Sequence, residues 1–247
     1  MAKQDPNISR KPPSVTEPIT ETRKVPIRDN GEPLVDFLKA APKVVQSTPR
    51  YKYKRETLVR ATVADMIRIA SENIPKGFKL AVVEGWRPPH VQRRMYLATW
   101  ARFKKNNPDW SDAHLRRVVN RYTAPINTPV PPPHSSGGAV DFVLLDANGE
   151  EVDMHSPFER LNSKIYSFDA PGLSDQARRH RDILGDALSK GGLTNYPSEY
   201  WHWSYGDQGW AYRGGHPYAL YGPTEPPGYK APPEDDNDEP FVFIIQG

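Results

Sequence analysis

The sequence predicts an α+β fold in which helices pack on a small, mostly antiparallel sheet. Short apolar runs typical of strands, amphipathic segments with helical spacing, and turns rich in glycine and proline all occur within its 247 residues, with no internal repeat. A chain of this length can bury one sizeable core, so we expect a single main domain.

Helices are indicated by apolar residues at helical spacing and by capping residues at the ends of segments. In the first such segment Val59, Val63, Ile67 and Ala70 would share one face. We expect helices over residues 57–70, from Pro88 or Pro89 through Phe103, from Ser111 to about Tyr122, and from Ser174 to the Gly191-Gly192 pair.

Strands are indicated by short apolar or aromatic runs between turn residues. We expect strands at KLAVVE (79–84), AVDFVLL (139–145) and YWHWS (200–204), with a hairpin turn over residues 146–150. The last apolar run, FVFII (241–245), is compatible with either an edge strand or an oligomer contact.

Composition divides the chain into three parts. Residues 1–24 are polar and rich in proline and threonine, which is typical of a flexible segment. Residues 25–222 would form the domain, and residues 223–247 would form a Pro-rich acidic tail.

Charge and residue usage exclude several classes of protein. The 33 basic and 30 acidic residues are spread along the chain and leave a net charge of +3, which argues against a nucleic-acid partner. The absence of cysteine excludes disulfides, iron–sulfur clusters and cysteine nucleophiles. We expect no membrane insertion and a cytoplasmic location, or a periplasmic one if a signal peptide has been removed. The oligomeric state stays open.

Two short clusters combine metal-ligand residue types with glycine or aromatic neighbours. In PHSSGGAVD, two glycines allow a tight bend that would fold the His134 imidazole back beside Asp141 on the following strand. In EYWHW, His202 lies among aromatic residues. Two imidazoles and one carboxylate would leave zinc an open fourth position, as in catalytic zinc sites, whereas calcium would need more oxygen ligands.

Glu199 precedes His202 by three residues. In a regular strand these two side chains would point to opposite faces, so both can approach one metal only if Glu199 lies on the bend before the strand. There it would act as a general base rather than as a ligand. From spacing alone, the clusters are also compatible with ordinary loop and aromatic core residues, and Arg87 with a structural ion pair.

The two clusters resemble the paired H-x6-D and E-x-x-H motifs of the VanX-type D-alanyl-D-alanine dipeptidases. This family belongs to a group of zinc peptidases that also contains D,D-carboxypeptidases and the hedgehog signalling domain. Further similarity lies in VPIRDNGEPLVD, EGWRPPHVQRRMY, SPFER and YWHWSYGDQGWAY, so the resemblance spans roughly residues 25–215. It implies a hedgehog/D,D-peptidase-like domain with one zinc ion per chain, held by His134, Asp141 and His202, and with Glu199 as the base.

The resemblance also implies roles for two further residues. Arg87, in GWRP, would stabilise the oxyanion, since a guanidinium stays charged and offers several donors. Glu159, in SPFER, would bind the free amine of a dipeptide. Two positions depart from the family pattern: Glu159 stands where an aspartate is expected, and Pro132 stands where a serine is often found. Both departures concern substrate recognition.

The implied function is zinc-dependent hydrolysis of D-Ala-D-Ala or similar small D-dipeptides from peptidoglycan precursors or turnover fragments. Two alternatives stay open, a D,D- or L,D-carboxypeptidase acting on longer wall peptides and a non-catalytic zinc-binding interaction domain. Retention of Glu199 and Arg87 favours an enzyme, because a binding module needs neither.

Overall fold

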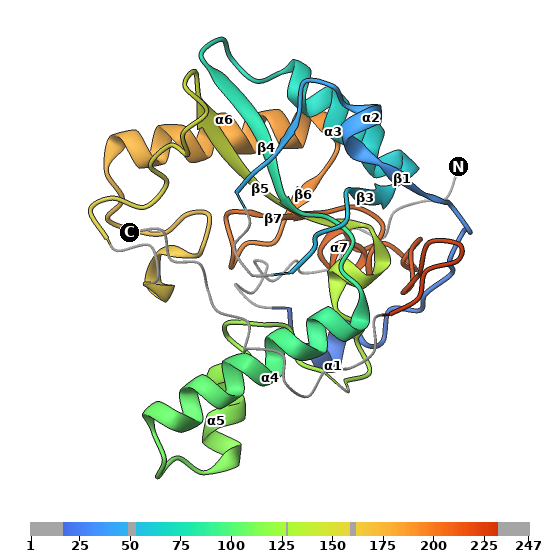
Figure 1. Cartoon of the computed structure of the whole chain (residues 1–247), viewed down its shortest axis with the longest axis vertical. Helices are drawn as coiled ribbons and strands as arrows, with labels where there is room; N and C mark the ends of the chain where they lie inside the picture. Colours follow the sequence, from blue (N-terminus) through green and yellow to red (C-terminus); the bar gives the residue numbers. More distant parts are fainter. Residues whose placement is uncertain (1–16, 49–52, 127, 159–161, 232–247) are drawn as a thin grey trace, which may run out of the picture.

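The computed structural model describes residues 17–48, 53–126, 128–158 and 162–231 (Figure 1). Its helices are α1 (Ile19–Thr22), α2 (Phe37–Ala40), α3 (Ala61–Glu72), α4 (Pro89–Asn106), α5 (Asp112–Val119), α6 (Asp175–Gly191) and α7 (Gln208–Gly214), with 3-10 turns η1 (Pro133–Ser136) and η2 (Ser163–Ile165). Its strands are β1 (Leu34–Asp36), β2 (Val45–Gln46), β3 (Leu58–Arg60), β4 (Phe78–Glu84), β5 (Ala139–Asp146), β6 (Thr194–Asn195) and β7 (His202–Ser204).

The central sheet of the described chain has the strand order β2-β4-β5-β7-β6. Strand β2 runs parallel to β4, and the other neighbouring pairs are antiparallel. A second, two-stranded sheet pairs β1 with β3. The predicted α+β class with a mostly antiparallel sheet is therefore confirmed.

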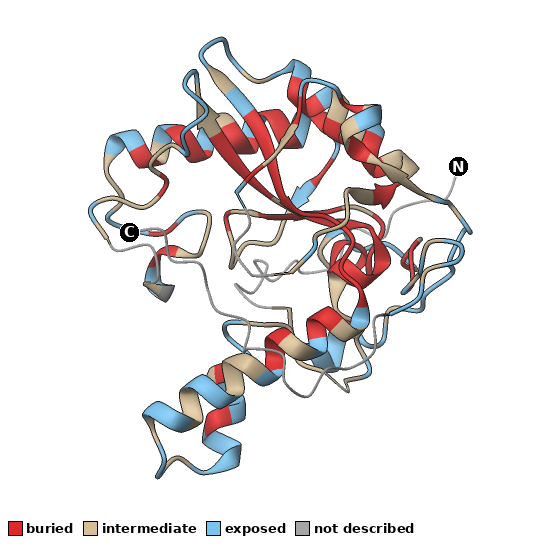
Figure 2. Cartoon of the chain, viewed as in Figure 1, coloured by how far each residue is buried: buried red, intermediate tan, exposed pale blue. Residues whose placement is uncertain are grey.

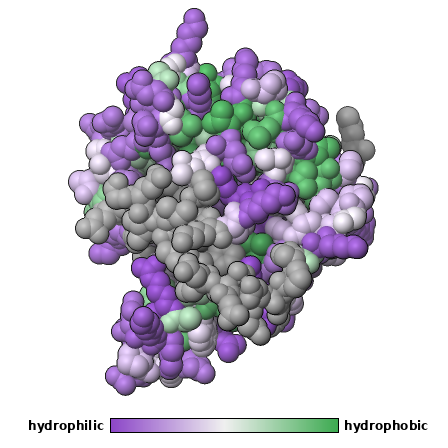
Figure 3. Space-filling model, viewed as in Figure 1, coloured by the Kyte–Doolittle hydropathy of each residue, from purple (hydrophilic) through white to green (hydrophobic). Residues whose placement is uncertain are grey.

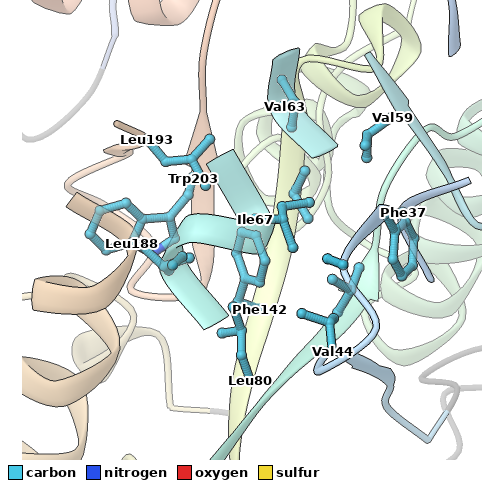
Figure 4. Close-up of a cluster of buried hydrophobic side chains, with 14 of the residues drawn as sticks. Phe37, Val44, Val59, Val63, Ile67, Leu80, Phe142, Leu188, Leu193 and Trp203 are labelled. Atoms are coloured by element: carbon cyan, nitrogen blue, oxygen red, sulfur yellow. The ribbon is translucent and has the colours of Figure 1, made fainter. Parts of the chain in front are cut away.

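The main core lies between one face of this sheet and helices α3 and α6 (Figure 2). Alternation along β5 directs Val140, Phe142 and Leu144 to this core, where Ile67 of α3 and Leu188 of α6 join them (Figure 4). All five are fully buried. Burying a side chain of this size stabilises the fold by about 1.5–3 kcal/mol, so these contacts hold β5 rigidly against the helices.

The opposite face of β5 carries Asp141, and the end of β4 adapts to it. Val82 lies opposite Phe142, but Glu84 lies opposite Asp141, so two residues of β4 correspond to one of β5. This arrangement is a β-bulge at Val83. In a regular ladder Glu84 would face the helices, because side chains alternate between the two faces of a strand. The bulge turns it to the face of Asp141.

Helices α4 and α5 form a hairpin that projects from the rest of the described structure (Figure 1). A small apolar cluster with Tyr96, Leu115 and Val119 holds the two helices together. The outward surface of the hairpin is largely exposed and mostly hydrophilic (Figures 2 and 3). After α5, the proline-rich residues 123–126 and 128–132 lead back to η1 and the sheet.

Several predicted element ends are confirmed. The Ser111 and Ser174 side chains cap α5 and α6 by accepting hydrogen bonds from backbone N–H groups three residues further on. Gly192, at φ +97°, ends α6, and Pro89 begins α4. Within the described ranges, the helices do not combine the length and apolar character needed to cross a lipid bilayer.

Two predicted boundaries are wrong. The helix expected over 57–70 begins only at Ala61, because residues 58–60 pair with β1 as a strand. The strand expected over 200–204 begins only at His202, because the two preceding residues lie in a turn. In both places long-range pairing and local turn geometry outweigh the apolar pattern of the segment.

The segment 17–24 packs against α7, which its composition did not indicate. Thr22 is buried, and Glu17 forms an ion pair and hydrogen bond with Arg213 of α7. The C-terminal run at 241–245 lies outside the described residues.

Candidate active site

Asp141 on β5 lies at the centre of the candidate site. Its register partners on the two neighbouring strands are His202 on β7 and Glu84 on β4. Three adjacent strands thus place one polar residue each in a single row, which spans only about 10 Å at the usual strand spacing. The His202 Nδ1 atom lies 3.0 Å from Asp141 Oδ1.

A tight bend after η1 brings His134 to this row. Gly137 has a left-handed φ of +70°, and a side chain there would collide with Leu34. The His134 Nε2 atom lies 3.4 Å from Asp141 Oδ1, and its Nδ1 atom lies 2.9 Å from the Gly85 carbonyl oxygen. Because a carbonyl oxygen only accepts, Nδ1 carries the proton and Nε2 presents its lone pair to the site.

The geometry of His134, Asp141 and His202 fits a metal ion. Each offers one ligand atom, and these atoms all lie within 4.8 Å of one another. Ligands of a tetrahedral zinc ion, each at 2.0–2.1 Å from it, are about 3.3 Å apart. The separations of 3.0 and 3.4 Å from Asp141 Oδ1 are close to that spacing. The predicted cluster is therefore brought together, and three protein ligands leave a fourth position open.

The charges of this cluster also suit a cation. Burial acts to raise the pKa of the Asp141 carboxyl, but the imidazoles of His134 and His202 outweigh it and hold that pKa well below its usual range. Burial lowers the pKa of the His134 imidazole. Burial also acts to lower the pKa of the His202 imidazole, but its contact with the Asp141 carboxylate outweighs this and raises that pKa. A metal ion binds a carboxylate and neutral imidazoles, so its binding would displace the proton that Asp141 favours on His202.

Glu199 lies in the turn before β7, as the sequence predicts. The turn is held by Asn195, whose Nδ2 atom donates to the carbonyl oxygens of Glu199 and His202 at 2.9 and 3.0 Å. The Glu199 side chain lines the same cavity as the three candidate ligands. Desolvation raises the pKa of its carboxyl to about 7, which suits proton exchange near neutral pH.

Arg87 follows the end of β4 and lines the same cavity. Its backbone N–H donates to the His134 carbonyl oxygen at 3.1 Å, and its Nη1 atom donates to Gln92 Oε1 at 2.8 Å. Its Nη2 atom lies 3.6 Å from Glu84 Oε2. Among the described residues, Arg87 Nε and Glu84 Oε1 are buried without a hydrogen-bond partner. Desolvation raises the pKa of the Glu84 carboxyl to about 7.

The cavity that contains these groups has a volume of about 480 Å³, within the range of small-molecule sites. Pro132 lies in its wall. Aromatic side chains contribute to the lining, among them Tyr122, Tyr166, Tyr196 and Trp201. Glu159, expected to bind an amine, lies outside the described residues.

Sequence reasoning did not identify Glu84, Gln92 or Asn195 as parts of the site. A signal for Glu84 was present, since it ends an apolar run three residues before Arg87. Its direction depends on the bulge in β4, however, and no residue pattern marked that bulge. Gln92 was one polar residue among several on a helix.

Fold and site together define a class of protein. A nearly buried His–Asp–His cluster with a glutamate and an arginine in one cavity is typical of a metal-dependent hydrolase. The model of the Peptidase_M15 family, described as D-ala-D-ala dipeptidase, matches residues 41–219. The chain belongs to this family of peptidases.

Individual relatives agree with this assignment. A D-alanyl-D-alanine dipeptidase of Synechocystis sp. is 30% identical over 247 residues, covering 86% of this chain and 100% of the relative. A D-alanyl-D-alanine dipeptidase of Escherichia coli is 24% identical over 152 residues, covering 62% of this chain and 68% of the relative.

Two solved structures are more distant. One is the vancomycin-resistance D,D-pentapeptidase VanY in complex with Zn(II), with a TM-score of 0.40, 14% identity, and coverage of 69% of this chain and 87% of that one. The other is the LD-carboxypeptidase LdcB, with a TM-score of 0.39, 16% identity, and coverage of 76% and 75%.

Proposed function

We propose that this chain is a zinc-dependent dipeptidase that hydrolyses D-Ala-D-Ala or similar small D-dipeptides. The observation that carries the proposal is the meeting of five residues in one cavity: the His–Asp–His ligand set, Glu199 and Arg87. The full-length match to a dipeptidase of Synechocystis sp. supports it. Peptidoglycan precursors and turnover fragments are the expected source of such substrates.

Each residue has a distinct task in this proposal. His134, Asp141 and His202 would hold zinc, which when bound would supply Lewis-acid chemistry. Glu199 would accept a proton from the attacking water and later give it to the leaving amine. Arg87 stabilises the negative charge that develops on the carbonyl oxygen of the substrate.

The free amine of the dipeptide needs an acidic partner, and Glu159 is our proposal for it. A carboxylate at this position would distinguish a dipeptide from a longer peptide, because binding a charged ammonium in a cavity requires a paired charge.

The test is the release of D-Ala from D-Ala-D-Ala by the zinc-loaded protein and by Glu199→Ala. We expect turnover by the wild type, and a loss of roughly 10²–10⁴-fold in the variant because the proton carrier is gone. Zinc stoichiometry should stay unchanged in Glu199→Ala, and Glu150→Ala, at an exposed turn position, should retain full activity. Stoichiometric zinc without turnover of any dipeptide would instead support a non-catalytic zinc-binding domain.

The cavity volume favours one second candidate, a carboxypeptidase that acts on longer wall peptides. D-Ala-D-Ala needs roughly 200 Å³ at the packing density of protein interiors, which is less than half of the 480 Å³ observed. Comparing D-Ala-D-Ala with its N-acetylated form separates the two. A dipeptidase should strongly prefer the free amine, whereas a carboxypeptidase should cleave both.

A further inference from the structure

Gln92 forms hydrogen bonds both to Arg87 and to Thr123 and Ala124, which begin the proline-rich wall of the cavity. It lies on the first turn of α4, and its side chain is 2% exposed. Its Oε1 atom accepts from Arg87 Nη1 at 2.8 Å. Its Nε2 atom donates to Thr123 Oγ1 and to the Ala124 carbonyl oxygen, each at 3.0 Å.

The orientation of the Gln92 amide follows from its partners. A guanidinium only donates hydrogen bonds and a backbone carbonyl oxygen only accepts them. The amide oxygen must therefore face Arg87, and the amide nitrogen must face Ala124. No rotated amide would satisfy both partners, so the buried side chain has one favourable arrangement.

Arg87 is attached to both ends of the cavity wall formed by residues 123–126 and 128–133. At the far end, the Arg87 backbone N–H donates to the carbonyl oxygen of His134, which directly follows the segment. At the near end, the guanidinium reaches Thr123 and Ala124 through Gln92. Hydrogen bonds thus join the wall, the candidate ligand His134 and the Arg87 guanidinium in one network.

We infer that Gln92 is a positioning residue that sets the direction of the Arg87 guanidinium in the cavity. The inference rests on the proposed function, which gives Arg87 its task at the oxyanion. A long, flexible side chain stabilises developing charge best when its donors are held in place before the reaction. The other partner, Glu84 Oε2, is 3.6 Å away, so Gln92 supplies the shorter contact.

The test is a double-mutant cycle of Gln92→Leu and Arg87→Ala, with kcat and KM measured on D-Ala-D-Ala. We expect Gln92→Leu to lower kcat by at least tenfold with less than a twofold change in KM, because a misplaced group costs rate rather than ground-state binding. In the Arg87→Ala background, Gln92→Leu should cause no further loss of kcat. A further tenfold loss there, or an unchanged kcat in the single variant, would overturn the inference.

Two additional variants separate positioning from structural damage. Gln92→Glu keeps an acceptor for Arg87 but replaces the donor to the Ala124 carbonyl with an oxygen, so we expect a kcat between that of Gln92→Leu and that of the wild type. A kcat no higher than that of Gln92→Leu would count against the inference. Gln208→Leu is the matched control, since Gln208 is also a buried glutamine that donates to a backbone carbonyl, that of Val25. It should lower stability without changing kcat.

A crystal structure of Gln92→Leu supplies a readout that does not depend on turnover. We expect the guanidinium of Arg87 to move away from the position seen here, whereas an unmoved guanidinium would overturn the inference. If the wild type cleaves no dipeptide, the proposed function fails, and this structure still decides whether Gln92 positions Arg87.

Discussion

Asp141 owes its chemistry to three neighbours: His202 and Glu84 beside it in the sheet, and His134 on η1. The imidazoles of His134 and His202 keep its pKa low despite burial, so that the carboxylate stays charged without solvent. On its other side lies Glu84, whose pKa is raised to about 7 by desolvation. Neighbouring carboxyl groups with such different proton affinities are characteristic of functional sites.

Arg87→Lys tests the need for a guanidinium at this place. Lysine keeps the charge but lacks the planar set of donors, so it cannot bond to Gln92 and a substrate oxygen with the same geometry. We expect kcat on D-Ala-D-Ala to fall about 10²-fold, with bound zinc unchanged. Arg178→Lys is the control, because the guanidinium of Arg178 also donates to two acceptors, the carbonyl oxygens of Phe168 and Ala170, but these residues do not line the cavity. It should lower stability and leave kcat intact.

At the scale of elements, two local irregularities create the site. The bulge in β4 turns Glu84 to the face of Asp141, and the glycine bend after η1 folds His134 back over β5. Without the bulge Glu84 would face the helices, and without the bend His134 would not lie beside Asp141. Such irregularities are common beside active sites because they redirect a side chain without breaking the sheet.

Gly137→Ala tests the bend. A left-handed alanine costs about 1–2 kcal/mol, and the added methyl group would also collide with Leu34. We expect a loss of stability in urea unfolding together with weaker zinc binding, because His134 would shift. Gly149→Ala is a matched control with φ +86° and open space around the new methyl group. Gly149→Ala should lose only the stability that a left-handed alanine costs, with no change in zinc affinity. Equal effects of both variants on zinc affinity would contradict this explanation.

For the whole molecule, the site joins segments that are far apart in the chain. His134, Asp141 and His202 span 69 positions, and the family match covers residues 41–219. A metal ion held by these residues would bind the folded chain in preference to the unfolded one. Binding should therefore stabilise the fold by mass action.

Removal of zinc should accordingly lower the melting temperature. At free zinc about 1,000-fold above its Kd the stabilisation is about 4 kcal/mol, which corresponds to roughly 10 °C for a chain of this size. Calorimetry with and without a chelator measures the shift. In His202→Ala the ligand set is incomplete, so the chelator should have almost no effect; an equal shift there would point to zinc bound elsewhere.

The sequence by itself determined the chemical groups of the site and most of the elements that carry them. The residue types in PHSSGGAVD and EYWHW, together with their family resemblance, predicted the candidate ligands and Glu199, and the caps Ser111 and Ser174 identified two helix starts. These features are local, since they depend on a few neighbouring residues and on backbone conformations that glycine, proline and serine favour.

Tertiary structure decided which distant groups meet. The pairing of residues 58–60 with β1, the direction of Glu84, and the contact of Gln92 with Thr123 all depend on register or on packing between separate segments. Residue patterns do not specify such relations, because the same alternation of apolar and polar residues is compatible with several registers and partners. Burial of Phe142 and its neighbours against α3 and α6 selects one of them, and the site follows from that choice.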